Sequence, residues 1–217
     1  MKKAVIVALL AVSTFNVYAA AEKHLILIGS TSQAVAFKPA NGVQYTQTTT
    51  DRLLPHMQVT NLSGLGKTAV NAWQSRLDLA ARYALNPFAK NAVVIDLGFD
   101  DWGQGIPLPT FRANYLNLLN GLKYAGQSKK FCALPLKTRI DTLPDRNKAG
   151  LTLEQYRSTI RNISKTGACT LITSDTWFSF AEVYNASLMK DGINLTIDGH
   201  ARYAYYLLIN LILSAGF

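Results

Sequence analysis

Short apolar runs alternate with longer amphipathic segments along most of the chain. The apolar runs, among them HLILIG and NAVVIDLG, end in turn-forming residues and are typical of strands buried on both faces. They occupy residues 24–29, 57–64, 91–98, 130–136 and 168–174. The segments between them carry apolar residues at helical spacing, over residues 68–85, 108–126, 152–167 and 196–213. This alternation predicts a parallel sheet with helices on both of its faces.

Capping residues mark where several of these helices should begin. Thr110 and Thr196 are expected N-caps, and Thr152 with Gln155 forms a capping-box pattern. The sequence has no repeat, low-complexity tract or linker, so we expect a single domain over residues 22–217. In a sheet of this kind, ligand sites lie outside the carboxyl ends of the strands.

The first 21 residues have the pattern of a secretory signal peptide. Lys2 and Lys3 precede an apolar run over residues 4–12, and three small residues close the segment at 19–21. We therefore expect export, to a bacterial periplasm or out of the cell. The apolar run is too short to cross a membrane, and the apolar C-terminal stretch is interrupted by Asn210, so an integral membrane protein is not expected.

Basic residues outnumber acidic ones, which gives the 217-residue chain a formal net charge of +9. This charge favours attraction to anionic glycans, lipid head groups or a cell-envelope polymer. A nucleic-acid partner is not expected, because no basic stretch alternates with stacking aromatic residues. The sequence is also compatible with a protein partner.

Two cysteines, Cys132 and Cys169, are the full complement of thiols. In an exported protein they favour a single disulfide. No metal site or cofactor is expected, because two cysteines and three scattered histidines show no ligand spacing. The segment GLGKT suggests a phosphate-binding loop, but Asn61 stands where the first glycine of that motif should be, so nucleotide binding is disfavoured.

The ends of four predicted elements resemble, in order and spacing, the SGNH (GDSL) family of ester hydrolases. The segments are IGSTS, NLSGLGKT, LGFDDW and DGINLTIDGH. The resemblance covers nearly the whole chain after the signal peptide. It implies a flavodoxin-like, three-layer α/β/α sandwich with a five-stranded parallel sheet, and an activity on acyl esters or acetylated carbohydrates. It also implies that Cys132 and Cys169 lie on neighbouring strands, at the end opposite the site.

Carried over residue by residue, the resemblance retains the framework and changes the chemistry. Thr31 stands at the position of the nucleophilic serine, and Asn194 at that of the catalytic histidine. Asp100 stands where an asparagine donates to the oxyanion. The retained positions are the oxyanion glycine, Gly66, and the aspartate of the triad, Asp191. Three further residues are candidate binding residues near these positions: Ser30, Lys67 and Trp102.

These changes remove the base that such a triad requires. Histidine accepts and returns a proton near neutral pH, whereas the amide of Asn194 does not titrate there. An ionised Asp100 accepts hydrogen bonds and donates none, so it would repel an oxyanion. The first hypothesis is therefore a non-catalytic binding or accessory protein for an acyl or glycan ligand.

The alternative hypothesis is a divergent ester hydrolase (esterase, lipase or acetylesterase) that uses Thr31. Its base could be Lys67, if burial lowered the pKa of that amine, or Asp100. His200 is a third candidate, although it lies within the predicted last helix and falls at a position that is not catalytic in the family.

Overall fold

The computed structural model describes residues 23–30, 57–123, 128–142 and 145–215. Five parallel strands form one sheet in the order β2-β1-β3-β4-β5. The strands are β1 (Lys23–Gly29), β2 (Met57–Asn61), β3 (Lys90–Asp96), β4 (Ser128–Ala133) and β5 (Thr170–Ile172). The predicted five-stranded parallel sheet is confirmed. The expected signal peptide lies outside the described residues.

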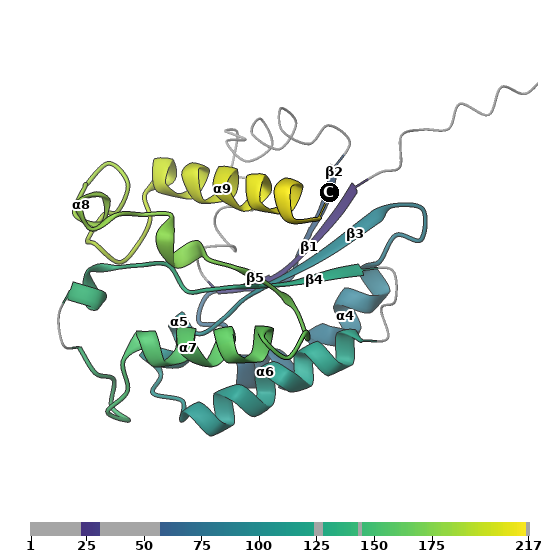
Figure 1. The fold of residues 1–217 in the computed structure, drawn as a ribbon, viewed down its shortest axis with the longest axis horizontal. Helices are drawn as coiled ribbons and strands as arrows, with labels where there is room; N and C mark the ends of the chain where they lie inside the picture. The colour runs from purple at the N-terminus through teal and green to yellow at the C-terminus, as the bar shows by residue number, and fades with distance from the viewer. Residues whose placement is uncertain (1–22, 31–56, 124–127, 143–144, 216–217) are drawn as a thin grey trace, which may run out of the picture.

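Helices cover both faces of the sheet, as Figure 1 shows. Four lie on one face, and a single long helix lies on the other. The four are α3 (Ala69–Gln74), α4 (Leu77–Ala84), α6 (Leu108–Leu122) and α7 (Leu153–Ser164), and the single helix is α9 (Ile197–Ala215). Short helical turns at the strand ends are α5 (Phe99–Gly103), α8 (Phe180–Val183), η1 (Arg139–Thr142) and η2 (Ser174–Thr176).

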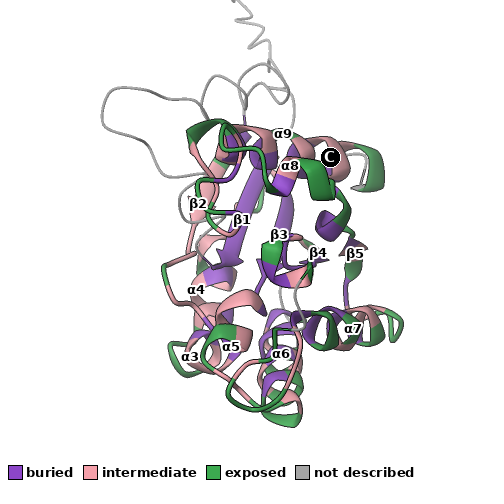
Figure 2. Cartoon of the chain, turned by 90° about the vertical axis from the view of Figure 1, so that its left-hand side faces the viewer, coloured by how far each residue is buried: buried purple, intermediate pink, exposed green. Residues whose placement is uncertain are grey.

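The sheet separates two hydrophobic cores. In β1, Leu25 and Leu27 pack toward α9, whereas Ile26 and Ile28 pack toward α3 and α6. Successive side chains of a strand point to opposite faces, so a run of apolar residues fills both cores at once. Figure 2 shows the resulting layer of buried strands between half-exposed helices.

The segment expected as one helix over residues 68–85 is two helices. Ser75 ends α3, and Arg76 adopts a left-handed backbone with φ of 54° before α4 begins. The Arg76 guanidinium bonds the buried carboxylate of Asp78 and lies over the ring of Trp73. This local ion pairing fixes a bend that apolar spacing does not reveal.

Two of the three expected helix starts are confirmed, and one is wrong. The Thr152–Gln155 capping box is present at α7, and the Thr196 hydroxyl accepts from the Gly199 N–H at α9. Thr110 is not an N-cap, because α6 already begins at Leu108 after Pro107. Proline fits the start of a helix because the N–H it lacks would have no partner there.

The expected disulfide between Cys132 and Cys169 is present, with 5.8 Å between the two Cα atoms. Cys132 lies in β4 and Cys169 directly precedes β5, and these two strands are neighbours, as the family resemblance implied. The resemblance also implied that both cysteines lie at the end of the sheet opposite the site, and this was wrong for Cys132. Because β4 begins at Ser128, Cys132 is the second-last residue of that strand and pairs in register with Ile95 of β3. The bond therefore ties β4, near its carboxyl end, to the residue that precedes β5.

The packing of α4 against α6 depends on a glycine. A Cβ at Gly121 would lie 2.1 Å from Oδ2 of Asp78, a side chain that is fully buried and held by Arg76 and Arg82. We expect Gly121→Ala to lower the free energy of unfolding by about 1–3 kcal/mol, because the helices must separate. Urea denaturation measures the change.

The matched control for this prediction is Gly103→Ala. A Cβ at Gly103 meets no atom within 4 Å, so we expect stability within about 0.5 kcal/mol of the parent. Equal stability of the two variants would show that the helices do not depend on this close approach.

Candidate functional site

A cavity of about 520 Å³ opens at the carboxyl edge of the sheet, the edge at which the strands end. Its lining combines polar and apolar residues. The polar residues are Ser30, Asp96, Asp100, Thr138, Asn194, Thr196 and His200. The apolar residues are Phe99, Pro135, Leu136, Ile193, Leu195 and Ile197. A hollow of this size with a few convergent polar groups is suited to a small ligand.

The ends of the two central strands form the polar floor of this cavity. Ser30 directly follows β1, and its N–H donates to the carbonyl of Asp96, the last residue of β3, at 2.9 Å. Gly98 then turns the chain with φ of 121°, so that α5 starts at once and carries Asp100 in its first turn. Adjacent strand ends thus place a hydroxyl and two carboxyl groups side by side.

Asp96 is a carboxyl group buried inside the protein. The Tyr203 hydroxyl, from α9, donates to its Oδ2 at 2.6 Å. Burial raises the pKa of Asp96 to about 7, against the lowering effect of the Tyr203 bond, and the nearby Asp100 adds to the increase. A neutral Asp96 can donate a hydrogen bond into the cavity as well as accept one.

Asp100 lines the cavity from the first turn of α5. Burial raises the pKa of this carboxyl group, and its Oδ2 has no hydrogen-bond partner among the described residues. The next residue, Asp101, has a structural role instead. Its Oδ1 accepts from the Ala69 N–H at 2.9 Å and so holds the start of α3.

Asp191 and Asn194 form a closed pair before α9. Asp191 Oδ1 accepts from the Asn194 N–H at 2.7 Å, and its Oδ2 accepts from the Asn194 side-chain amide at 2.8 Å. These bonds lower the pKa of Asp191. Asn194 lines the cavity, and because Asp191 takes one of its two side-chain N–H groups, the second N–H and the amide oxygen can serve a ligand.

The structure brings some of the predicted site residues together and leaves others apart. Ser30, Asp100 and Asn194 line one cavity, and Asp191 holds Asn194. Thr31 lies outside the described residues, directly after Ser30.

Three predicted site residues do not line the cavity. Gly66 adopts φ of 66°, and its carbonyl accepts from Asn71 and Gln104. Lys67 folds back toward Gly64. Trp102 packs at the edge of the core, where its indole N–H donates to the Leu151 carbonyl at 3.0 Å.

The sequence also indicates Asp96 as a site residue, although this residue belongs to none of the family motifs. A charged residue closes the otherwise apolar run NAVVID, at the edge where ligands bind. Thr138 follows β4 without any motif, and only the folded chain shows that it lines the cavity. His200 lines the cavity from the first turn of α9, which the helix prediction alone did not establish.

No group of three or more His, Cys, Asp and Glu residues converges as metal ligands within the described part of the chain. Among the helices described, none is both long enough and apolar enough to cross a membrane.

The five-stranded parallel sheet, flanked by helices and with the cavity at its carboxyl edge, is a three-layer α/β fold that matches SGNH hydrolase structures. The model of the GDSL-like Lipase/Acylhydrolase family matches residues 29–202, and the chain belongs to this family. No curated protein shows a significant match to the sequence.

Several solved structures share the fold at low identity. A possible lipase from Chitinophaga pinensis is 14% identical, with a TM-score of 0.67 over 90% of this chain and 99% of that one. The acetyl xylan esterase AlAXEase is 15% identical, with a TM-score of 0.67 over 87% and 100%. The esterase EstA from Pseudoalteromonas sp. is 17% identical, with a TM-score of 0.65 over 89% and 100%.

The raised pKa of Asp96 makes stability depend on pH. Above about pH 4 the unfolded chain ionises this group, whereas the folded chain keeps its proton up to about pH 7. Stability therefore falls as pH rises through this window, by up to about 1.4 kcal/mol per pH unit for this group. Asp96→Asn keeps an acceptor for Tyr203, and we expect it to stabilise the protein more at high pH than at low pH.

Urea denaturation at about pH 5 and about pH 8 measures this difference. The control is Asp145→Asn, an exposed carboxylate, which should leave the pH dependence of stability unchanged. A parallel pH dependence for Asp96→Asn and the parent would show that Asp96 is ionised throughout.

Proposed function

We propose that this chain is a binding or accessory member of its family that holds an acyl or glycan ligand in the carboxyl-edge cavity without hydrolysing it. The observation that carries the proposal is the closed Asp191–Asn194 pair. Family resemblance assigns these positions to the aspartate and histidine of a triad. Here the carboxylate is paired with an amide that takes up no proton near neutral pH, so the pair cannot activate a nucleophile.

The carboxyl groups of the cavity floor also favour binding over hydrolysis. Ester hydrolysis places negative charge on a substrate oxygen, and this charge needs hydrogen-bond donors. An ionised Asp100 donates none and repels that charge. Burial raises the pKa of Asp96 to about 7, and the neutral form of this group can donate to a hydroxyl or carbonyl of a bound ligand.

The mixed lining of the cavity suits an acyl or acylated sugar ligand. The apolar side chains of Phe99, Leu136, Ile193, Leu195 and Ile197 can cover an apolar chain, while the polar lining residues offer hydrogen bonds to hydroxyl groups. The signal-peptide pattern supports a location in the periplasm or outside the cell. There the ligand would be an acyl ester, a glycan or a cell-envelope polymer.

A second candidate function is a divergent ester hydrolase with Thr31 as nucleophile. It is favoured by Asp100, which lines the cavity with an oxygen that has no hydrogen-bond partner among the described residues. A base with a raised pKa is better matched to neutral pH. Lys67, the other candidate base, does not line the cavity. If Asp100 is the base, the rate should rise as pH increases through its pKa, because only the ionised form accepts a proton.

Hydrolysis of p-nitrophenyl acetate, p-nitrophenyl butyrate and acetylated xylo-oligosaccharides separates the two functions. We expect the parent and Thr31→Ala to show the same background rate, because no base activates residue 31. Calorimetry should give both proteins the same affinity for an acetylated xylo-oligosaccharide, within about twofold. Hydrolysis that Thr31→Ala abolishes would establish the hydrolase instead. Failure to bind any acyl or glycan ligand would contradict the binding function.

A triple substitution tests whether chemistry alone separates this chain from an active hydrolase. Thr31→Ser, Asp100→Asn and Asn194→His together restore the residue types that the family uses. We expect p-nitrophenyl acetate hydrolysis at least 10²-fold above the parent, the usual contribution of a positioned general base. The matched control carries Thr31→Ala with the other two changes and should stay at background. Equal rates for the triple variant and this control would show that the cavity cannot position an ester.

A further inference from the structure

The acidic residues of the described chain lie almost entirely at one edge of the sheet. With the exception of Asp78, every described carboxylate lies between the carboxyl end of a strand and the first turn of the next long helix. Asp78 is fully buried and paired with Arg76 and Arg82. The opposite edge, at which the strands begin, is called here the amino edge. Its charged residues in the described part of the chain are therefore almost all basic.

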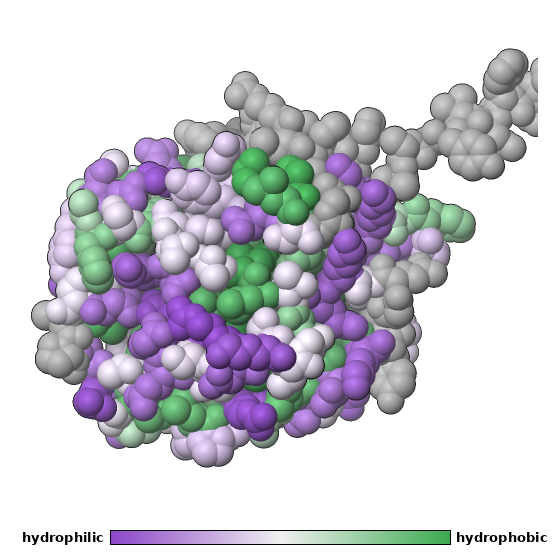
Figure 3. Space-filling view, viewed as in Figure 1, coloured by the Kyte–Doolittle hydropathy of each residue, from purple (hydrophilic) through white to green (hydrophobic). Residues whose placement is uncertain are grey.

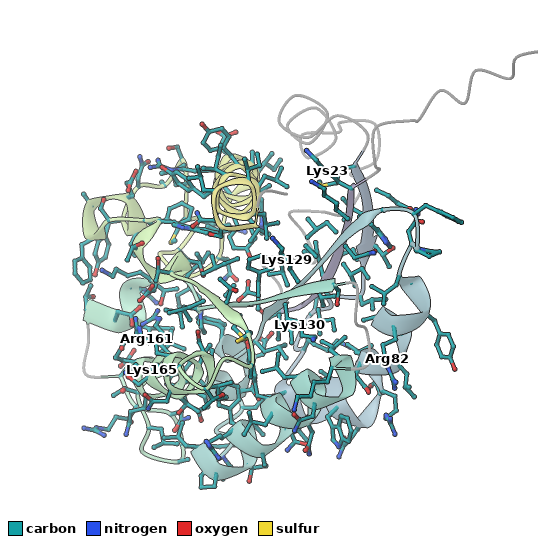
Figure 4. All side chains as sticks on the ribbon, turned by 45° about the vertical axis from the view of Figure 1, so that its right-hand side comes forward. Lys23, Arg82, Lys129, Lys130, Arg161 and Lys165 are labelled. Carbon is teal, nitrogen blue, oxygen red and sulfur yellow. A yellow bond between two sulfur atoms is a disulfide. The ribbon has the colours of Figure 1, made fainter. Side chains whose placement is uncertain are left out.

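The amino edge carries lysines on three adjacent strands. Lys23 and Lys90 are the first residues of β1 and β3 and stand directly opposite each other in the register. Lys129 and Lys130 follow at the start of β4. Burial lowers the pKa of the Lys130 amine, and the nearby Lys123 adds to the decrease. Figure 4 shows Lys23, Lys129, Lys130 and Arg82 on the side of the molecule where the strands begin.

Two almost fully exposed aromatic side chains stand beside these lysines. Phe88 is 88% exposed in the turn between α4 and β3, and Tyr83 is 87% exposed in the last turn of α4. This turn forms the right-hand extreme of the described ribbon in Figure 1. An apolar protrusion stands at the same place among hydrophilic side chains in Figure 3.

Buried hydrogen bonds hold the turn that presents Phe88. The Asn91 side chain donates to the carbonyls of Asn86 and Ala89, at 2.8 and 3.0 Å, and accepts from the Asn86 N–H. Asn91 is itself bonded to the buried ring of His24. The Phe88 N–H donates to the Asn86 side chain at 2.9 Å. The aromatic ring is thus displayed on a fixed turn rather than on a loose loop.

Fold electrostatics account for only part of this surface. Lysines such as Lys123, at the C-terminal end of a helix, complement the helix dipole. The dipole does not explain why a rigid turn holds a phenylalanine in solvent. An edge that carries lysines together with a displayed aromatic ring has the composition of a surface that inserts into a lipid interface.

We propose that the amino edge docks on an anionic phospholipid membrane, with Phe88 and Tyr83 at the acyl boundary and Lys23, Lys90 and Lys129 among the phosphate groups. A displayed phenylalanine gains most from an environment that removes the whole ring from water, which favours a bilayer over an anionic polymer. Docked in this way, the protein turns the carboxyl-edge cavity away from the membrane. Its ligand would then come from the aqueous side.

Vesicle sedimentation tests the proposal. The protein is expressed from the full 217-residue sequence and purified as the host cell processes it. The probes are vesicles of phosphatidylcholine alone and of phosphatidylcholine with phosphatidylglycerol in equal parts. We expect binding only to the anionic vesicles. Phe88→Ser should weaken it by roughly tenfold, and Lys23→Gln with Lys90→Gln should weaken it by at least that factor.

Matched controls place the same changes at the carboxyl edge. Phe180→Ser removes an exposed aromatic residue there, and Lys148→Gln with Lys190→Gln removes two exposed lysines. Both should bind as the parent does. Equal losses in these controls would overturn the proposal, since they would reveal a general charge or hydrophobic effect. Binding that falls with the Lys23 and Lys90 changes but not with Phe88→Ser would also overturn it and indicate an anionic polymer.

Fluorescence tests insertion directly. Tryptophan emission shifts to shorter wavelength in an apolar environment, so Phe88→Trp should show a blue shift on anionic vesicles that the parent and Phe180→Trp do not show. Absence of the shift in vesicle-bound Phe88→Trp would exclude insertion of the turn and overturn the proposal. Circular dichroism of each variant confirms that the fold is retained.

Discussion

The hydrogen bond from Tyr203 to Asp96 joins the last helix to the central strand, and the arrangement of the cavity depends on it. Both groups are buried, so neither has water as an alternative partner. The bond fixes α9 over the carboxyl edge, while the Thr196 cap sets the point at which α9 begins. Together they determine where the preceding loop places Asn194. The main-chain bond from Ser30 to Asp96 ties the neighbouring strand to the same point.

The layers of the fold could be predicted because strands that are buried on both faces consist of runs of apolar residues. The strands β1, β3 and β4 are covered on both faces, and their residues fill both cores. The break at Arg76 could not be predicted, because it depends on ion pairs around the buried Asp78. The start of α6 was misplaced because Thr110 is a common N-cap residue, whereas Pro107 provides the start without a side-chain bond.

The candidate site was predicted in part, for a physical reason. Ser30, Asp100 and Asn194 could be placed at one edge because parallel strands all end there. Asp96 and Thr138 escaped notice because a position relative to a motif says nothing about which side chains turn into a hollow. Gly66, Lys67 and Trp102 are near in sequence to the expected motifs but do not line the cavity, since the loops that carry them bond to α3, α5 and the chain before α7.

Fold and chemistry are carried by different residues in this protein, so one can change without the other. Among the described residues, the two positions at which the chain departs from the catalytic pattern, Asp100 and Asn194, belong to neither core. Asp191 and Asn194 are exposed and bond mainly to each other, so an amide in place of an imidazole costs the sheet and its helices little. Similarity of fold is therefore a weak guide to activity here. The chemistry must be argued from the groups that face the cavity, where the buried Asp96 and the half-buried Asp100 both have raised pKa values.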